Sequence, residues 1–384
     1  MKTHDGEHSG RLIWVDAWKA ILIILVVMGH VFGTAAHYVP TCISGYYSLV
    51  FKIIYSFHMP AFFMLAGLMT SKKSRGISVM VQFQKQCRRL LIPYFTFGSV
   101  AVIIYLVAMP YFSNASIGST GYYDKFMAWK WWHPLVSILY GASFPGTDGF
   151  RCNSVLWFLP CMFSVKVIGM WLLRLVGTSS RAVRLAILLI IPTVFLGWVS
   201  QFAGIPSLPY GLSNVLWYFP FFLIGYSVRS IIFDGIAMWL SRNLWVIRIA
   251  YVLMLAVFAI LVWRLPHDTI YSRIHLRWYL VEVVLGILGS FLSMGIAMKM
   301  PIYFSRICYK FSMNSIGIMF LHKYIILGIM LIPVTKCLWF KSFPVGIMVS
   351  FFVIIVSAWG ACSISSCVRR FMPWAMGEVR DGLF

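Results

Sequence analysis

The stretch RLIWVDAWKAILIILVVMGH, residues 11–30, decides the fold class, because it is long and apolar enough to form a membrane-spanning helix. It nevertheless contains Asp16 and Lys19 and ends with His30. A charged side chain inside a spanning helix costs about 2.5–3.5 kcal/mol, so such residues usually face the protein interior or a water-filled cavity. Lys19 and His30 are eleven positions apart, about three turns and 16 Å along one helix face. This stretch therefore predicts a site or a path inside the membrane.

The composition of the whole chain is that of a membrane protein. Its 384 residues are 61% hydrophobic and 11% charged, whereas soluble domains carry about 25% charged residues. The mean hydropathy is +0.85. The apolar runs lack the period-two alternation of barrel strands, so helices are expected to satisfy the backbone inside lipid. We predict an all-α, polytopic integral membrane helical bundle that forms a single domain over residues 1–384.

Ten apolar runs reach the length of about 20 residues that a spanning helix needs. Their approximate bounds are 13–35, 46–70, 90–110, 155–174, 183–201, 212–230, 245–264, 278–298, 312–332 and 344–366. With the N-terminus placed in the cytoplasm, twenty Lys and Arg residues fall on the inner side and nine on the outer side. Because cytoplasmic loops are enriched in Lys and Arg, this asymmetry predicts about ten transmembrane helices with both termini cytoplasmic.

The net charge of +22 would suggest a nucleic-acid partner in a soluble protein. Here the basic residues cluster in alternate loops, so membrane lipid, and not nucleic acid, is the expected partner. The eight cysteines form neither a CxxC pair nor a Cys/His cluster with metal-ligand spacing, so no metal is expected. The GxSxG, Walker A, HEXXH and GxGxxG signatures of soluble enzymes are also missing from the sequence.

Three histidines are expected at a similar depth in the membrane. His30 lies in the outer half of the first run, His58 near the middle of the second, and His322 about ten residues into the ninth. Histidine suits proton transfer near neutral pH, although a lone membrane histidine more often makes an interhelical hydrogen bond. His30 stands apart because it shares a helix face with Lys19. Asp16, three residues before Lys19, would stabilise the charge of that lysine.

Two local features predict how the helices pack around these histidines. Gly33 lies four residues after Gly29, and such a spacing of small residues permits close helix approach. Pro60 follows His58 and removes a helix hydrogen bond, so a kink is expected there. The kink would free carbonyl groups at the depth of the histidines, or it would serve packing alone.

The segment SKKSRGISVMVQFQKQCRRLLIPYF, residues 71–95, carries a basic cluster on the inner side. Lys85, Arg88 and Arg89 fall within about one helical turn. Arginine binds phosphate groups through forked hydrogen bonds, so this cluster is a candidate anion site. Anchoring on anionic lipid is the alternative interpretation.

Aromatic and acidic residues mark the outer side. The loop of residues 111–154 contains MAWKWWHP, in which Trp131 and Trp132 would stack on a sugar ring or form an interfacial aromatic belt. Glu282 lies near the outer end of the eighth run, where it would hold a sugar hydroxyl or pair with Arg277.

Taken together, these blocks resemble the acyltransferase-3 family of membrane O-acyltransferases, especially its fucose-acetylase-like branch. The spacing from Lys19 to His30 fits the family's basic residue, ten intervening residues and histidine. SFHMPAFFMLAGLM, residues 56–69, resembles its second helix, and KQCRRLLIPYF, residues 85–95, resembles its third, although the usual Arg-x-x-Arg reads Lys85 and Arg88 here. Further resemblances are VLWFLPCMF at 155–163, LWYFPFFLIGY at 216–226 and NSIGIMFLH at 314–322.

The resemblance implies an enzyme that moves an acetyl group from cytoplasmic acetyl-CoA to a sugar hydroxyl in the bacterial inner (cytoplasmic) membrane. The acceptor would be a cell-envelope or exported polysaccharide, or its lipid-linked precursor. His30 would be the general base or a transient acyl carrier. Together with the residues singled out above, the candidate site residues fall into three sets: His30, Lys19 and Asp16 for catalysis; Lys85, Arg88, Arg89 and Arg11 for CoA; and His58, Glu282, His322, Trp131 and Trp132 for the acceptor.

Two other functions are compatible with a polytopic chain. A transporter of a sugar or an amino acid would favour paired, broken helices in the two halves, and the sequence does not have them. A non-catalytic component of polysaccharide export is the other alternative. An assay of labelled acetyl transfer separates all three.

Overall fold

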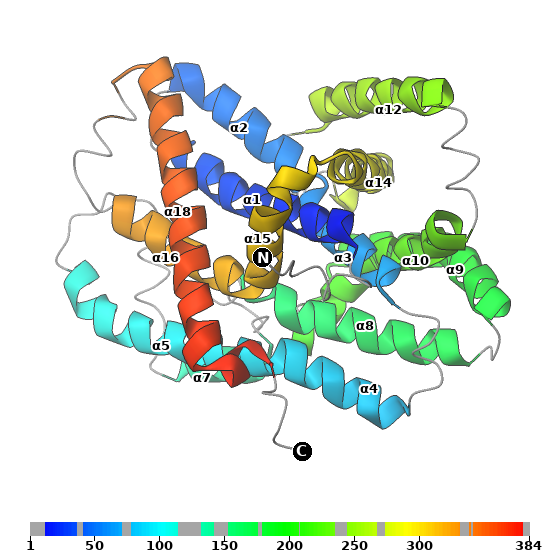
Figure 1. Cartoon of the computed structure of the whole chain (residues 1–384), viewed down its shortest axis with the longest axis horizontal. Helices are drawn as coiled ribbons and strands as arrows, with labels where there is room; N and C mark the ends of the chain where they lie inside the picture. Colours follow the sequence, from blue (N-terminus) through cyan, green and yellow to red (C-terminus); the bar gives the residue numbers. More distant parts are fainter. Residues whose placement is uncertain are drawn as a thin grey trace, which may run out of the picture. The chain divides into compact units, whose positions relative to one another are not determined.

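The computed structural model describes residues 12–36, 41–70, 78–113, 132–141, 153–175, 179–206, 208–234, 244–266, 273–330, 338 and 341–378. Every regular element in these ranges is a helix (Figure 1). The predicted all-α class is therefore confirmed for the described chain.

The helices fall into α-helices and shorter 3₁₀ or π turns. The α-helices are α1 (Ile13–Ala35), α2 (Thr41–Tyr55), α3 (His58–Leu68), α4 (Val79–Gln86), α5 (Ile92–Ser113), α7 (His133–Leu139), α8 (Phe158–Arg174), α9 (Ser179–Phe202), α10 (Leu212–Asp234), α12 (Leu244–Arg264), α14 (Leu276–Met298), α15 (Ser305–Met313), α16 (Ser315–Met330) and α18 (Phe343–Phe371). The short turns are the π-helix η2 (Cys87–Leu91) and the 3₁₀ turns η3 (Pro209–Gly211), η4 (Ile302–Phe304) and η5 (Pro373–Met376).

Eight helical stretches of the described chain are long and apolar enough to cross a membrane. A ninth arises if Ile302–Met313 and Ser315–Ile329, which bend by 77° at Asn314, count as one broken span. The predicted run 155–174 corresponds to α8, which has 17 residues and is shorter than these eight. A multi-span membrane protein is therefore supported, while the count of ten and the cytoplasmic termini stay predictions.

The chain divides into two compact units that interleave in sequence. Unit 1 is Met1–His58 with Leu288–Ser365, and unit 2 is Met59–Ile287 with Ser366–Phe384. The expectation of a single domain over residues 1–384 stays a prediction.

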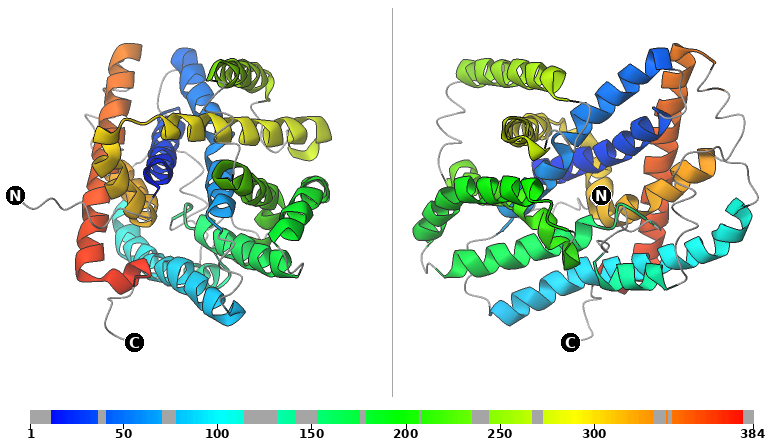
Figure 2. Two further views of the ribbon diagram at one scale, coloured as in Figure 1. Left: turned by 45° about the vertical axis from the view of Figure 1, so that its right-hand side comes forward. Right: turned by 180° about the vertical axis from the view of Figure 1, so that it is seen from behind.

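Unit 1 is organised around α1, which packs against α2, α15 and α16 (Figures 1 and 2). The predicted glycine pair makes one of these contacts close. A Cβ atom added at Gly29 would lie 2.7 Å from the ring of Tyr55, and one at Gly33 would lie 2.8 Å from the ring of Phe51. The two aromatic rings are themselves stacked, with centroids 3.9 Å apart. The Gly-xxx-Gly spacing therefore lets α2 lay its aromatic side chains against the backbone of α1.

The kink was expected at Pro60, close to the junction of α2 and α3. Proline cannot donate to the carbonyl four residues earlier, which is that of Ser56. Helix α2 ends at Tyr55 and α3 begins at His58, so the break falls at Ser56 and Phe57. Ser44–Leu68 still counts as one candidate span, so Tyr55 and His58 flank a two-residue interruption within it.

Unit 2 is built from α8, α9 and α10, the green helices of Figures 1 and 2, with α3, α4, α5 and α12. Glycines again allow the closest approach. A Cβ atom at Gly67 of α3 would overlap the Phe222 carbonyl, and one at Gly225 of α10 would overlap the Met64 carbonyl. Backbone-to-backbone contact through small residues is the usual way in which membrane helices associate, because lipid offers no hydrophobic driving force between them.

Candidate functional site

Helix α1 carries all three residues that the first stretch singled out. Asp16 is buried, and its Oδ1 accepts a hydrogen bond of 2.6 Å from Ser312 Oγ of α15. Trp18 is fully buried and donates from Nε1 to Ser293 Oγ at 3.0 Å. Asp16 is thus bonded to a hydroxyl group on a neighbouring helix. These two bonds tie the N-terminal half of α1 to neighbouring helices of unit 1, and Lys19 is partly exposed on the same helix.

His30 contacts two groups from other helices. The Tyr55 hydroxyl lies 3.3 Å from Nδ1 and 3.5 Å from Nε2 of His30. The His322 ring lies with its centroid 5.1 Å from that of His30, at an interplanar angle of 37°. Helices α1, α2 and α16 therefore each supply one ring to a single cluster in unit 1.

His58 and His322 are anchored in the same way. Each Nδ1 lies 2.8 Å from the backbone carbonyl four residues earlier, that of Ile54 for His58 and that of Ile318 for His322. A carbonyl oxygen only accepts hydrogen bonds, so Nδ1 carries the hydrogen and Nε2 of the neutral ring is an acceptor. Within the described part of the chain, the buried Nε2 of His322 has no hydrogen-bond partner. Nε2 of His322 is therefore available to accept a proton or a hydrogen bond from a hydroxyl group.

Tyr55 was missed in reading the sequence, and it links the histidines. Its ring packs edge-on against His58, with centroids 4.8 Å apart, while its hydroxyl reaches His30. The available signal was its place three residues before His58, which puts the two side chains near one another across the helix break. The three predicted histidines and Tyr55 thus form one cluster, hereafter the histidine cluster, although the roles of its members stay predictions.

The predicted basic segment belongs to unit 2. Ser78 accepts from the Val81 N–H and caps the start of α4, which carries Lys85. Arg88 and Arg89 follow in the π-helix η2, and both side chains are exposed. Exposed guanidinium groups in adjacent positions can reach a soluble polyanion. Arg11 lies outside the described residues.

The predicted outer residues are placed in part. Glu282 is buried and pairs with Arg273, whose Nε lies 3.2 Å from Oε2. The anticipated partner Arg277 instead lies over the ring of Trp278, 4.4 Å from its centroid, so that pairing was wrong. The Arg273 guanidinium also lies 5.0 Å from the ring centroid of Trp217. Glu282 therefore sits in a charged and aromatic setting.

The two outer tryptophans differ in what the structure describes. Trp132 precedes α7, and its ring contacts His133 with centroids 4.0 Å apart. Trp131 lies outside the described residues.

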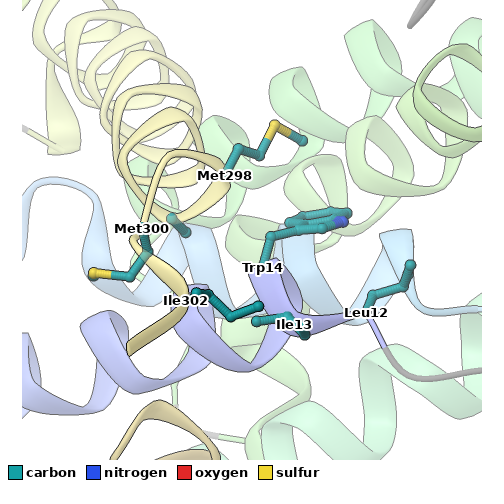
Figure 3. A pocket seen from close by; sticks show the side chains of 7 residues that line it. Leu12, Ile13, Trp14, Met298, Met300 and Ile302 are labelled. Atoms are coloured by element: carbon teal, nitrogen blue, oxygen red, sulfur yellow. The ribbon is translucent and has the colours of Figure 1, made fainter. Parts of the chain in front are cut away.

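A surface pocket of about 360 Å³ lies elsewhere in unit 1 (Figure 3). Its lining residues are Leu12, Ile13, Trp14, Ala297, Met298, Met300 and Ile302. None of these side chains titrates or acts as a nucleophile. This pocket therefore offers no side chain for proton transfer, in contrast to the histidine cluster.

Comparison with known proteins gives the chain a family context. A family model described as an acyltransferase domain matches residues 12–366. The nodulation protein NolL of Sinorhizobium fredii is 30% identical over 133 residues, which are 34% of this chain. The match spans 36% of the length of that relative. No solved structure matches this chain.

Proposed function

Because the chain belongs to the acyltransferase family whose model spans residues 12–366, we propose that it is a membrane O-acetyltransferase. The donor is cytoplasmic acetyl-CoA, and the acceptor is a hydroxyl group of a cell-envelope or exported polysaccharide or of its lipid-linked precursor. The enzyme works in the bacterial cytoplasmic membrane, with ten spans and both termini inside. The observation that carries the proposal is the contact of His30 with Tyr55 and His322, which gathers proton-transferring groups within one helix cluster.

In the proposed reaction, the oxygen of a sugar hydroxyl attacks the thioester carbonyl carbon of acetyl-CoA while His30 accepts the hydroxyl proton. The C–S bond then breaks, the acetyl group remains on the sugar oxygen, and His30 returns the proton to the departing thiolate. Tyr55 holds the His30 ring in orientation through its hydroxyl. Lys19 and Asp16 belong to the same helix and extend its polar face towards the inner side.

The donor is a polyanion, and the basic segment offers it cations. Lys85, Arg88 and Arg89 are exposed on α4 and η2, where forked hydrogen bonds to CoA phosphates are sterically open. We include Arg11 in this set because of its charge and its place just before α1.

The acceptor offers hydroxyl groups, and the remaining predicted residues suit them. Nε2 of His322 and of His58 can each accept a hydrogen bond. The carboxylate of Glu282 accepts from Arg273 through Oε2, and carboxylate oxygens are the acceptors that sugar hydroxyl groups require. Trp131 and Trp132 are proposed to stack on a sugar ring.

The test is acetyl transfer by purified protein in proteoliposomes, with labelled acetyl-CoA and envelope polysaccharide. We expect label in ester linkage to the glycan. His30→Ala should lower the initial rate by about 10²–10⁴-fold, because a general base typically contributes that much. The exposed histidine variant His275→Ala is the matched control and should leave the rate unchanged. A loss of less than about threefold in the His30→Ala rate would be far smaller than this range and would refute the assignment.

A further inference from the structure

The backbone at Arg88 and Arg89 departs from the α-helix for a reason that lies in the sequence. Pro93 has no N–H, and in an α-helix its ring would clash with the carbonyl four residues earlier, that of Arg89. The backbone avoids this clash by forming the π-helix η2, in which the Ile92 N–H donates to the Cys87 carbonyl, five residues back. The next bond of this series would join the Arg88 carbonyl to Pro93, which cannot donate. Within the π-helical series, the Arg88 carbonyl therefore has no donor five residues later.

A second segment, 289 positions later in the chain, packs against this peptide. Gly377 has a φ of +72°, which places it in the left-handed region. A Cβ atom at Gly377 would overlap the Arg88 carbonyl oxygen, and it would lie 3.0 Å from both the Arg88 carbonyl carbon and the Arg89 Cα. Two separate features therefore disfavour any residue other than glycine at position 377: the positive φ, and the lack of room for a Cβ atom beside Arg88.

The turn that presents Gly377 is well anchored. Ala375 and Met376 of η5 are buried, and the Gly377 N–H donates to the Trp374 carbonyl at 2.9 Å. The Glu378 N–H donates to the Pro373 carbonyl at 3.0 Å. The Glu378 carboxylate also pairs with Arg369 of α18 at 3.1 Å. A turn held in place by these bonds can restrain the position of the Arg88 peptide that it contacts.

We propose that Gly377 is a positioning residue of the donor site, which sets the Arg88–Arg89 peptides so that both guanidinium groups meet the phosphates of acetyl-CoA. The inference rests on the proposed function for the identity of the ligand. Gly377 itself does not touch the donor. It acts by holding the π-helical backbone, a distortion that recurs at functional sites, from the side that Pro93 leaves unbonded.

Three variants separate this role from general stability. Gly377→Ala introduces both the strained φ and the overlap with Arg88. Gly377→Asn relieves part of the strain, because asparagine tolerates the left-handed region, but it keeps the overlap. Gly204→Ala is the matched control, since Gly204 has a φ of +61° and nothing within 4 Å of an added Cβ atom.

The experiment measures the initial rate of acetyl transfer against acetyl-CoA concentration, together with the calorimetric affinity for CoA and the Tm of each variant. Both Gly377 variants should raise the KM for acetyl-CoA and weaken CoA binding by about tenfold, the loss of one hydrogen bond to a charged group. The kcat should stay within about twofold of wild type, because only donor binding changes. Gly204→Ala should change neither constant.

Parallel measurements on Arg88→Ala and Arg89→Ala distinguish the two ways to fail. If neither arginine variant weakens CoA binding, the donor site itself is wrongly assigned. If they do weaken it, and Gly377→Asn binds CoA like wild type, the positioning role is overturned. If the Gly377 variants do not fold, Glu378→Gln replaces them in the test. This substitution weakens the ion pair with Arg369 that anchors the turn and adds no atom near Arg88. It should then raise the KM for acetyl-CoA, and an unchanged KM would count against the proposal.

Discussion

At the scale of single residues, the histidine cluster is defined by which nitrogen of each ring is already occupied. In both His58 and His322, Nδ1 donates a hydrogen bond to the backbone carbonyl four residues earlier in the chain. The bond fixes both the ring orientation and the tautomer, so Nε2 is the nitrogen presented to a substrate. His30 differs, because its recorded partner is the side chain of Tyr55 from another helix. The orientation of its ring therefore depends on α2.

Tyr55→Phe should slow the reaction without unfolding the protein. The substitution removes the hydroxyl that lies 3.3 Å from His30 Nδ1 and keeps the ring stacked on Phe51. A neutral hydrogen bond contributes about 0.5–1.5 kcal/mol, which corresponds to a loss of roughly two- to twelvefold in kcat. Steady-state kinetics at saturating acetyl-CoA measure it. Tyr303→Phe, at a tyrosine that is 83% exposed, is the control. Equal kcat values for the two variants would show that the Tyr55 hydroxyl is dispensable.

At the scale of helices, two glycines control the distance between α1 and α2. Gly29 faces the Tyr55 ring and Gly33 faces the Phe51 ring, each too close for a methyl group. The site and the packing are therefore coupled, because the aromatic residue that Gly29 accommodates also reaches His30.

Gly29→Ala should lower both the Tm and the rate of transfer. The added Cβ would lie 2.7 Å from the Tyr55 ring, so α2 must shift, and overpacking of this kind costs about 1–3 kcal/mol. Differential scanning fluorimetry and the transfer assay measure the two effects. Gly45→Ala in α2 is the control, since nothing lies within 4 Å of its added Cβ and alanine favours helix. A Gly29→Ala protein as stable and active as the control would argue against the coupling.

At the scale of the whole molecule, the prediction concerns sidedness. Lys and Arg crowd the loops assigned to the cytoplasm, and the basic segment lies among them. The proposed donor groups belong to unit 2, whereas the histidine cluster belongs to unit 1. Because the charge bias predicts a cytoplasmic position for the basic segment, we expect the proposed enzyme to take its soluble donor from the cytoplasm and to modify glycan in the other compartment.

Sealed membrane vesicles of opposite orientation test this expectation. Labelled acetyl-CoA offered to the cytoplasmic face should label glycan on the opposite face, because CoA is too polar to cross the bilayer. Vesicles in which only the outer face meets the donor should remain unlabelled, and permeabilised vesicles serve as the positive control. Label found only on glycan at the cytoplasmic face would contradict transfer across the membrane while leaving the acetyltransferase assignment intact.

The sequence by itself determined the features that depend on neighbouring residues. Composition and run length fixed a helical membrane protein, since lipid leaves the backbone no other way to bond within a run. The Gly29–Gly33 spacing predicted a close helix contact, and Pro60 predicted a local irregularity, which falls at Ser56 and Phe57. These outcomes follow from helical periodicity and from a missing N–H, both of which act over a few residues.

Only the tertiary structure decided which distant side chains meet. Ser312 donates a hydrogen bond to Asp16, the Tyr55 hydroxyl contacts His30, and Gly377 lies against Arg88. No local pattern predicts such pairs, because helix periodicity fixes the face of a residue but not the helix that covers it. Packing decides which helix covers a given face. Small residues allow close approach of a neighbouring helix, and buried polar atoms favour a neighbour that supplies a hydrogen-bond partner.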